Sequence, residues 1–213
     1  FGLDPLWGWV LGNEGGLYHT VDSGITWTHT AVSTSWLDAV YFRNTLNGFV
    51  AGADTFLITE DGGESWNSGT LPGFYFDDLY FQDDGQGVGL EGYLTPSEGL
   101  IWTTADFGSS WKLSLETARG LRALAAQDGQ HLWAVGDAGQ MAHSSDGGKN
   151  WEAVNRGLGS QAAASPDLNA VTFAGGAGWA VGSRGAVWRF RPVGVPAAQW
   201  EVASAGDYEL RAV

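Results

Sequence analysis

One short pattern recurs four times along this chain of 213 residues and constrains its fold more than any other feature. Each copy begins with Ser or Thr, has Asp two positions later and Gly two positions after that, and ends with Trp. The copies span residues 20–27, 59–66, 104–111 and 144–151. A repeat with a period of about 40 residues predicts a propeller or an array of similar units.

Two further elements precede the pattern in each unit. An apolar run bounded by glycine lies at 8–12, 48–52, 132–136 and 178–182, and an alternating run led by Leu or Phe lies at 37–42, 76–81, 121–124 and 168–173. Short alternating runs flanked by Gly, Asp and Asn indicate strands, and the 33 glycines argue against helices. Each unit therefore has four strands. The sequence predicts an all-β fold, a β-propeller built of four-stranded antiparallel blades.

The two ends of the chain are nearly complementary in repeat phase. The chain ends on residues 210–213, half of a leucine-led strand, and begins with Phe1, the residue that would finish such a strand. We therefore expect a single domain over 1–213 with five blades, closed by the C-terminal strand segment, because closure removes exposed sheet edges. The predicted blades are 210–213 plus 1–36, 37–75, 76–120, 121–167 and 168–209. The alternative is a trimmed piece of a larger ring.

We call the recurring pattern the Asp box and expect it to be structural. Asp accepts hydrogen bonds from nearby backbone N–H groups in a tight turn, and Gly supplies a backbone conformation that other residues resist. The Trp is expected to fold back between neighbouring sheets, where its burial removes ~200 Å² from water, at most roughly 5 kcal/mol. Calcium or sugar binding is the alternative, but the spacing lacks the alternating oxygen ligands of a calcium loop. The residues given this role are Asp22, Trp27, Asp61, Trp66, Asp106, Trp111, Asp146 and Trp151. The fifth unit replaces the box by a proline-containing hairpin and keeps Trp200.

The four boxes, together with Gly-Trp-Ala-Val-Gly at 178–182 and Leu-Arg-Ala-Val at 210–213, resemble the Asp-box propellers, also called bacterial neuraminidase repeats. The whole pattern most resembles the photosystem II stability/assembly factor family and its relatives in non-photosynthetic bacteria. Sialidases, family-74-type glycanases and sortilin-like receptors carry the same box, so the resemblance implies the fold more specifically than the function. That family forms a larger, seven-bladed ring, so five blades would be a reduced version, and its members carry an arginine patch where the first strand of each blade begins. The equivalent positions here are Asp38, Asp77, Arg122, Asn169 and Arg211.

The chain is strongly acidic, with a formal net charge of −14. This excludes nucleic acid and anionic membranes as expected partners. Residues 1–118 carry 16 acidic and 2 basic residues, whereas 119–213 carry 8 of each. The asymmetry indicates either ordinary solubility charge or an oriented docking surface. No run is apolar for long enough to span a membrane. No signal peptide is present in this chain, whose start inside a strand suggests processing or trimming, and the resemblance to exported proteins suggests a periplasmic, lumenal or extracellular location.

The sequence does not predict an enzyme, a cofactor or a metal site. Sialidase chemistry needs three clustered arginines and a Tyr–Glu pair, and no matching pair can be placed. For a glycosidase, Asp38 and Asp77 are the one defensible pair of carboxylates. Their alternative partners are Arg122, Arg211 or water around the channel. The four histidines, His19, His29, His131 and His143, lack metal-ligand spacing and are expected to be half-exposed strand residues.

We expect binding on the face that carries the loops between blades and between the second and third strand of each blade. Two long loops, 89–99 and 155–167, lie there, and insertions in repeat proteins tend to map to the binding face. Aromatic and arginine side chains there favour protein contacts. The sequence thus predicts a non-catalytic scaffold or assembly factor for a protein partner, such as a membrane complex or its subunit. A carbohydrate-binding or glycan-cleaving propeller is the alternative. The predicted partner-binding residues are Arg122, Arg211, Arg184, Asp38, Asp77, Asn169, Trp36, Tyr75 and Tyr93.

Overall fold

The computed structural model describes most of the chain. It covers residues 2, 5–37, 39–52, 55–69, 78–81, 87–91, 99–108, 110–154, 165–191, 199–204 and 211, and at 13, 87–91, 191, 199 and 201–204 it describes the backbone alone. These residues form five antiparallel sheets, and no α-helix lies among them. The prediction of an all-β propeller is confirmed.

The sheets follow one another along the chain, and within each sheet the strands are in sequence order. The first sheet holds β1 (Gly8–Leu11), β2 (Gly16–Thr20) and β3 (Thr28–Ala31), and the second holds β4 (Ala39–Phe42), β5 (Gly48–Gly52), β6 (Thr55–Thr59) and β7 (Asn67–Ser68). The third holds β8 (Asp78–Phe81), β9 (Gly87–Glu91), β10 (Gly99–Thr104) and β11 (Lys112–Thr117). The fourth holds β12 (Leu121–Ala126), β13 (Leu132–Gly136), β14 (Met141–Ser144) and β15 (Glu152–Ala153), and the fifth holds β16 (Leu168–Ala174), β17 (Ala177–Gly182), β18 (Ala186–Arg191) and β19 (Gln199–Ser204).

Short 3-10 turns connect the first two strands of the first sheet and the second and third strands of the fourth and fifth sheets. They are η1 (Asn13–Gly15), η2 (Asp137–Gly139) and η4 (Ser183–Gly185). The glycine before such a turn lets two strands approach closely, since a Cβ at Gly182 would collide with the carbonyl oxygen of Asp167. This explains the glycine that ends the Trp-Ala-Val-Gly run.

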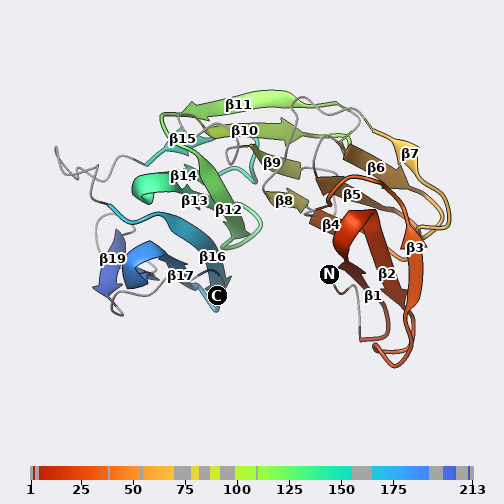
Figure 1. The fold of residues 1–213 in the computed structure, drawn as a ribbon. Coiled ribbons are helices and arrows are strands. Elements are labelled where there is room, and N and C mark those ends of the chain that lie inside the picture. The colour runs from red at the N-terminus through yellow and green to blue at the C-terminus, as the bar shows by residue number, and fades with distance from the viewer. Residues whose placement is uncertain are drawn as a thin grey trace.

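Figure 1 shows the five sheets side by side in an arc, with the inner edge formed by β1, β4, β8, β12 and β16. Successive inner strands contact each other from β1 to β16. The predicted closure falls on residues 205–210, 212 and 213, which lie outside the described residues. Among the described residues the first sheet has three strands. Only an isolated bridge between Gly2 and Gly8 extends it on the inner side. Closure into five blades therefore stays a prediction.

The core lies between the sheets. Because successive strand residues point to opposite faces, each sheet has one face toward the sheet before it and one toward the sheet after it. Between the first two sheets Trp9 and Leu17 pack with Phe42 and Val50, and the Trp9 and Phe42 rings stack at 3.8 Å. Comparable clusters fill the spaces between the second and third, third and fourth, and fourth and fifth sheets.

The first sheet lies at one end of the arc and its outward face is exposed. In the fifth sheet the cross-strand pair Ala180 and Trp188 faces the fourth sheet and is 0% and 2% exposed. The same pair in the first sheet is Val10 and Tyr18, and these side chains are 49% and 40% exposed. The difference follows from position in the arc, because the described residues place no sheet before the first one.

Candidate functional site

Each Asp box is a turn held by its own carboxylate. In the second sheet Thr59 Oγ1 donates to Asp61 Oδ1 at 2.8 Å, and the backbone N–H of Ser65 donates to the same oxygen at 2.9 Å. The Ser65 hydroxyl donates to Asp61 Oδ2 at 2.5 Å. The side-chain and backbone hydrogen bonds from Ser65, followed by that from Thr59, lower the pKa of Asp61 to about 2. The carboxylate is thus occupied by its own turn, which favours the structural role over ligand binding.

The same bonds recur in the other three boxes. Asp22, Asp106 and Asp146 each accept from the hydroxyl two positions before them and from the backbone N–H four positions after them. Their pKa values are lowered as well. Strand boundaries follow the boxes, since β6 ends at Thr59 and β7 begins directly after Trp66.

The box tryptophans differ in burial, and here one expectation is wrong. Trp151 is 8% exposed and packs among residues of the third and fourth sheets, such as Ile101 and Leu121. Trp27 is 44% exposed, although the sequence predicts that every box Trp lies between neighbouring sheets. Trp66, Trp111 and Trp151 each pack toward the preceding sheet. The first sheet has no preceding sheet among the described residues, so Trp27 stays exposed.

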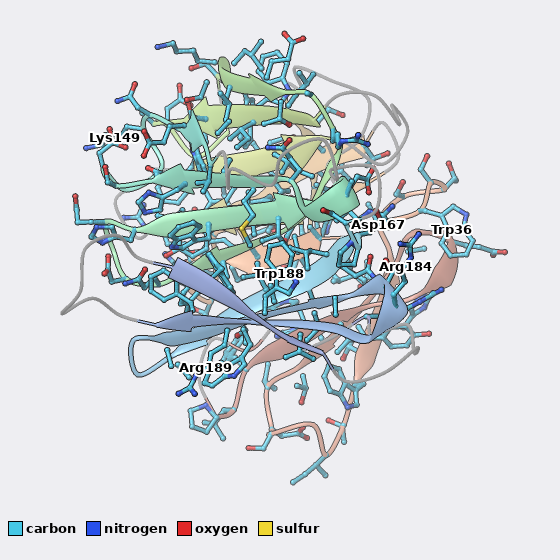
Figure 2. The ribbon with its side chains drawn as sticks, turned by 90° about the vertical axis from the view of Figure 1, so that its left-hand side faces the viewer. Trp36, Lys149, Asp167, Arg184, Trp188 and Arg189 are labelled. Carbon is cyan, nitrogen blue, oxygen red and sulfur yellow. The ribbon has the colours of Figure 1, made fainter. Side chains whose placement is uncertain are left out.

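The arc has two different faces. The box face carries the Asp boxes and the hairpin loops they bond to, as where Gly62 N–H donates to the Leu46 carbonyl at 2.8 Å. The loop face carries η1, η2, η4 and the connections between sheets. Figure 2 shows Trp36, Asp167 and Arg184 on one side of the molecule and Lys149, in the fourth box, on the other.

Arg122 lies on the loop face and joins the fourth sheet to the fifth. Its Nε donates to Asp137 Oδ1 at 2.5 Å, its Nη1 donates to Asn169 Oδ1 at 3.3 Å, and its Nη2 lies 3.7 Å from Asp167 Oδ2. The Arg122 side chain is 32% exposed. Because its guanidinium already meets three partners, Arg122 is better placed to hold the two sheets together than to receive a ligand.

We call this network the inter-sheet latch; its members are Arg122, Asp137, Asp167, Asn169 and Ser183. Asp167 completes it. Its Oδ1 accepts from the backbone N–H of Ala138 at 2.9 Å, and its own N–H donates to Ser183 Oγ at 2.9 Å. The carboxylate thereby fixes η2 of the fourth sheet, while its backbone fixes η4 of the fifth. Sequence reasoning selected Arg122 and Asn169 but missed Asp137, Asp167 and Ser183.

The other predicted binding residues are only partly described. Trp36 is 61% exposed, and Arg184 and Arg211 are exposed. Arg184 lies within η4 with a φ of 55°, in the left-handed region. The remaining members of the predicted set, Asp38, Asp77, Tyr75 and Tyr93, lie outside the described residues, as do 92–98 and 155–164 from the two long loops.

A buried carboxylate that sequence reasoning missed lies next to Asp77. Asp78 Oδ1 accepts from the N–H of Leu79, and Oδ2 accepts across the sheets from the N–H of Leu124, both at 2.8 Å. Burial raises the pKa of Asp78 to about 6, although the two hydrogen bonds act to lower it. The equivalent residues in other units are Ala39 and Ala123. An acidic residue in place of this alanine is the feature of the sequence that could have identified Asp78.

Among the residues that the structure describes, no three His, Cys, Asp or Glu side chains come together as metal ligands would. Within the same residues, no helix has the length and apolarity needed to span a bilayer.

Comparison with known proteins finds similarity to photosystem II assembly factors by both family model and sequence. A family model described as photosynthesis system II assembly factor YCF48 matches residues 114–191. Photosystem II stability/assembly factor HCF136 of Arabidopsis thaliana is 29% identical over 112 residues, which are 50% of this chain and 28% of that protein. Photosystem II assembly lipoprotein Ycf48 of Synechococcus sp. (strain CC9902) is 27% identical over 202 residues, 88% of this chain and 59% of that protein.

A solved structure supports the same fold. YCF48 bound to a D1 peptide superposes with a TM-score of 0.70 at 23% identity, covering 95% of this chain and 65% of that one. The chain thus spans between 28% and 59% of the length of these two curated relatives. The repeats, the box geometry and these matches agree. The chain is therefore an Asp-box β-propeller, of the bacterial neuraminidase repeat type, that is related to the photosystem II assembly factors.

Proposed function

We propose that the chain is a non-catalytic assembly or stability factor that docks a segment of a protein partner on its loop face. The observation that carries this proposal is the match to the Synechococcus assembly lipoprotein, which runs over 88% of the chain rather than over one unit. A protein segment as partner is supported by the solved YCF48 structure, which has a D1 peptide bound. The relatives' names also support a partner that belongs to a membrane complex.

The loop face has the chemistry that such docking needs. Trp36 exposes 61% of its surface, and Arg184 is exposed on the same side of the molecule (Figure 2). Aromatic and arginine side chains dominate the binding energy of protein interfaces. The inter-sheet latch fixes η2 and η4 in place, so a partner would meet an ordered surface and lose less free energy to ordering it.

In this proposal, two of the residues predicted to bind the partner have a different role. Arg122 and Asn169 act as positioning residues, because both are engaged in the latch. Trp36, Arg184 and Arg211 are proposed as contact residues. The proposed set also keeps Asp38, Asp77, Tyr75 and Tyr93, with the role given to them by the sequence.

We also propose that the protein works in a periplasmic, lumenal or extracellular compartment. One relative is named a lipoprotein and the other is named chloroplastic, and both names are consistent with a location outside the cytoplasm.

The binding proposal is tested with a fluorescein-labelled D1 peptide in anisotropy titrations. We expect Trp36→Ala and Arg184→Ala each to weaken binding at least tenfold. Ala138 adopts the same left-handed conformation at the equivalent position of η2, so Arg184→Ala keeps a residue that the turn accepts. Lys149→Ala, on the box face, is the matched control and should bind like the wild type. Unchanged affinity in both loop-face variants would contradict the proposal.

A further inference from the structure

Phe107, in the third Asp box, departs from the pattern of the repeat. Its φ is 55°, in the left-handed region that bulky side chains seldom adopt. The equivalent residues are Ser23, Gly62 and Gly147, whose φ values are 64°, 81° and 74°. The turn requires this conformation, and glycine adopts it without strain. A phenylalanine kept at a strained position points to a role for its ring.

The ring of Phe107 contacts two groups. It lies parallel to Phe81, with centroids 6.0 Å apart and an interplanar angle of 7°. Arg43, from the loop between β4 and β5, places its guanidinium carbon 4.5 Å from the ring centroid. These contacts fix the ring at the boundary between the second and third sheets.

A pocket of about 360 Å³ opens beside this ring on the box face. Its apolar wall includes Tyr41, Ile58 and Phe107. This volume lies in the range of small-molecule sites, which combine an apolar wall with a few placed polar groups.

The polar rim of the pocket carries both donors and acceptors. Arg43 and Asn47 offer N–H donors, whereas Glu60 and Asp106 offer carboxylate oxygens. Within the described residues, neither Arg43 nor Glu60 takes part in an ion pair. Asp106 is partly occupied, since Thr104 and Ser110 already donate to it.

This rim discriminates by charge. An anion would approach two carboxylates and a single guanidinium, so the net formal charge of the rim opposes it. A cation would approach the like charge of Arg43, which lies over the Phe107 ring. A neutral ligand with an apolar ring face and hydroxyl groups at its edge meets neither obstacle, because the edge can both donate and accept.

We propose that this pocket binds a hexopyranose residue of a neutral glycan. The apolar face of the sugar packs against Tyr41, Ile58 and the part of the Phe107 ring that lines the pocket. Its hydroxyls bond to Arg43, Asn47 and Glu60. The site lies on the box face, opposite the loop face, so it is independent of the protein-docking function proposed above.

The test uses the purified 213-residue chain with cellobiose, maltose and galactose as probes, followed by saturation-transfer NMR and by ¹H–¹⁵N shift changes. We expect at least one of these sugars to bind and to shift the amides of residues 59–60 and 106–108. Phe107→Gly restores the residue found at Gly62 and Gly147, so the turn should still form, but the association constant should fall at least tenfold. Arg43→Gln should weaken binding as well.

Three controls make the outcome decisive. Ser23→Gly makes the same kind of change in the first box and should leave sugar binding unchanged, while Phe107→Tyr keeps the ring and should retain it. Acetate and inorganic phosphate test the anionic alternative. Absence of binding by all three sugars, equal binding by Phe107→Gly, or binding of the anions at this pocket instead would each overturn the proposal. Because D1-peptide binding is measured separately on the loop face, failure here leaves that proposal intact.

Discussion

The packing of the box tryptophans makes a quantitative prediction, because two chemically identical residues differ in burial. Trp151 is 8% exposed and donates from Nε1 to the Gly148 carbonyl at 3.0 Å. Trp27 is 44% exposed and makes the equivalent bond to Gly24 at 3.1 Å. Replacing either residue by alanine removes the same turn hydrogen bond. The difference between the two variants therefore reports the burial of the ring between sheets.

The magnitudes follow from area. A buried Trp removes ~200 Å² from water, and Trp→Ala changes in cores cost about 3–5 kcal/mol. We expect Trp151→Ala to lose about 3–5 kcal/mol of unfolding free energy. Trp27 buries roughly half as much, and none of the described sheets closes around the cavity it leaves, so Trp27→Ala should lose about 1–2 kcal/mol. At ~2–4 °C per kcal/mol for a chain of this size, the midpoints should fall by about 6–20 °C and 2–8 °C.

The assay is thermal and urea unfolding followed by far-UV circular dichroism, which does not depend on the fluorescence of the deleted ring. Trp36→Ala, which removes a ring that is 61% exposed, serves as control and should change stability least. Equal losses for Trp27→Ala and Trp151→Ala would refute the open first sheet. That result would instead favour the ring closure predicted from the two ends of the chain.

Three other effects can be predicted from single contacts. The pKa of Asp78 is raised to about 6, so the folded state holds this proton more tightly than the unfolded chain does. The unfolding free energy should therefore fall by up to about 3 kcal/mol as pH rises from 4 through 6, and Asp78→Asn should abolish this fall in pH-dependent urea titrations. Ser65→Ala should raise the carboxyl pKa of Asp61 from about 2 toward its ordinary value in a ¹³C NMR titration, and an unshifted pKa would contradict the geometry. Arg122→Gln should lower the unfolding free energy by about 1–2 kcal/mol in chemical unfolding and increase amide exchange around Asp137. Unchanged stability and exchange would contradict a stabilising role for the inter-sheet latch.

Periodicity in the sequence predicted the strands well, because the box combines a turn with an obligatory hydroxyl and a following Trp. In the structure a strand ends at each hydroxyl residue: β2 at Thr20, β6 at Thr59, β10 at Thr104 and β14 at Ser144. Local chemistry decides these boundaries: the hydroxyl accepts the N–H of the box glycine, as Thr59 does from Gly63 at 2.8 Å. Such bonds depend on residues only a few positions apart, which a sequence displays directly.

The inter-sheet latch could not be predicted in this way. Asp137 and Asp167 occupy different positions in their units, yet both carboxylates approach Arg122. Their meeting depends on how far the fourth and fifth sheets are rotated against each other, which no repeat offset encodes. The exposure of Trp27 was missed for a related reason, because burial of a box Trp depends on a neighbouring sheet rather than on its own turn.

Asp78 and Phe107 belong to a different class, since the sequence does contain their signal. Each replaces a residue that the other units share: an alanine at the position of Ala39 and Ala123, and a small residue at the position of Gly62. Reading the exceptions to the repeat, rather than its matches alone, identifies both the buried carboxylate and the aromatic wall of the pocket.

The claim that the loop face docks a protein segment is tested most directly by mapping a D1 peptide onto the assigned ¹H–¹⁵N spectrum of the chain. We expect the amide shift changes to gather around Trp36, Ala138, Asp167 and Arg184 and to leave the four Asp boxes unchanged. Shift changes confined to the box face, or none at saturating peptide, would contradict a protein-docking role for the loop face.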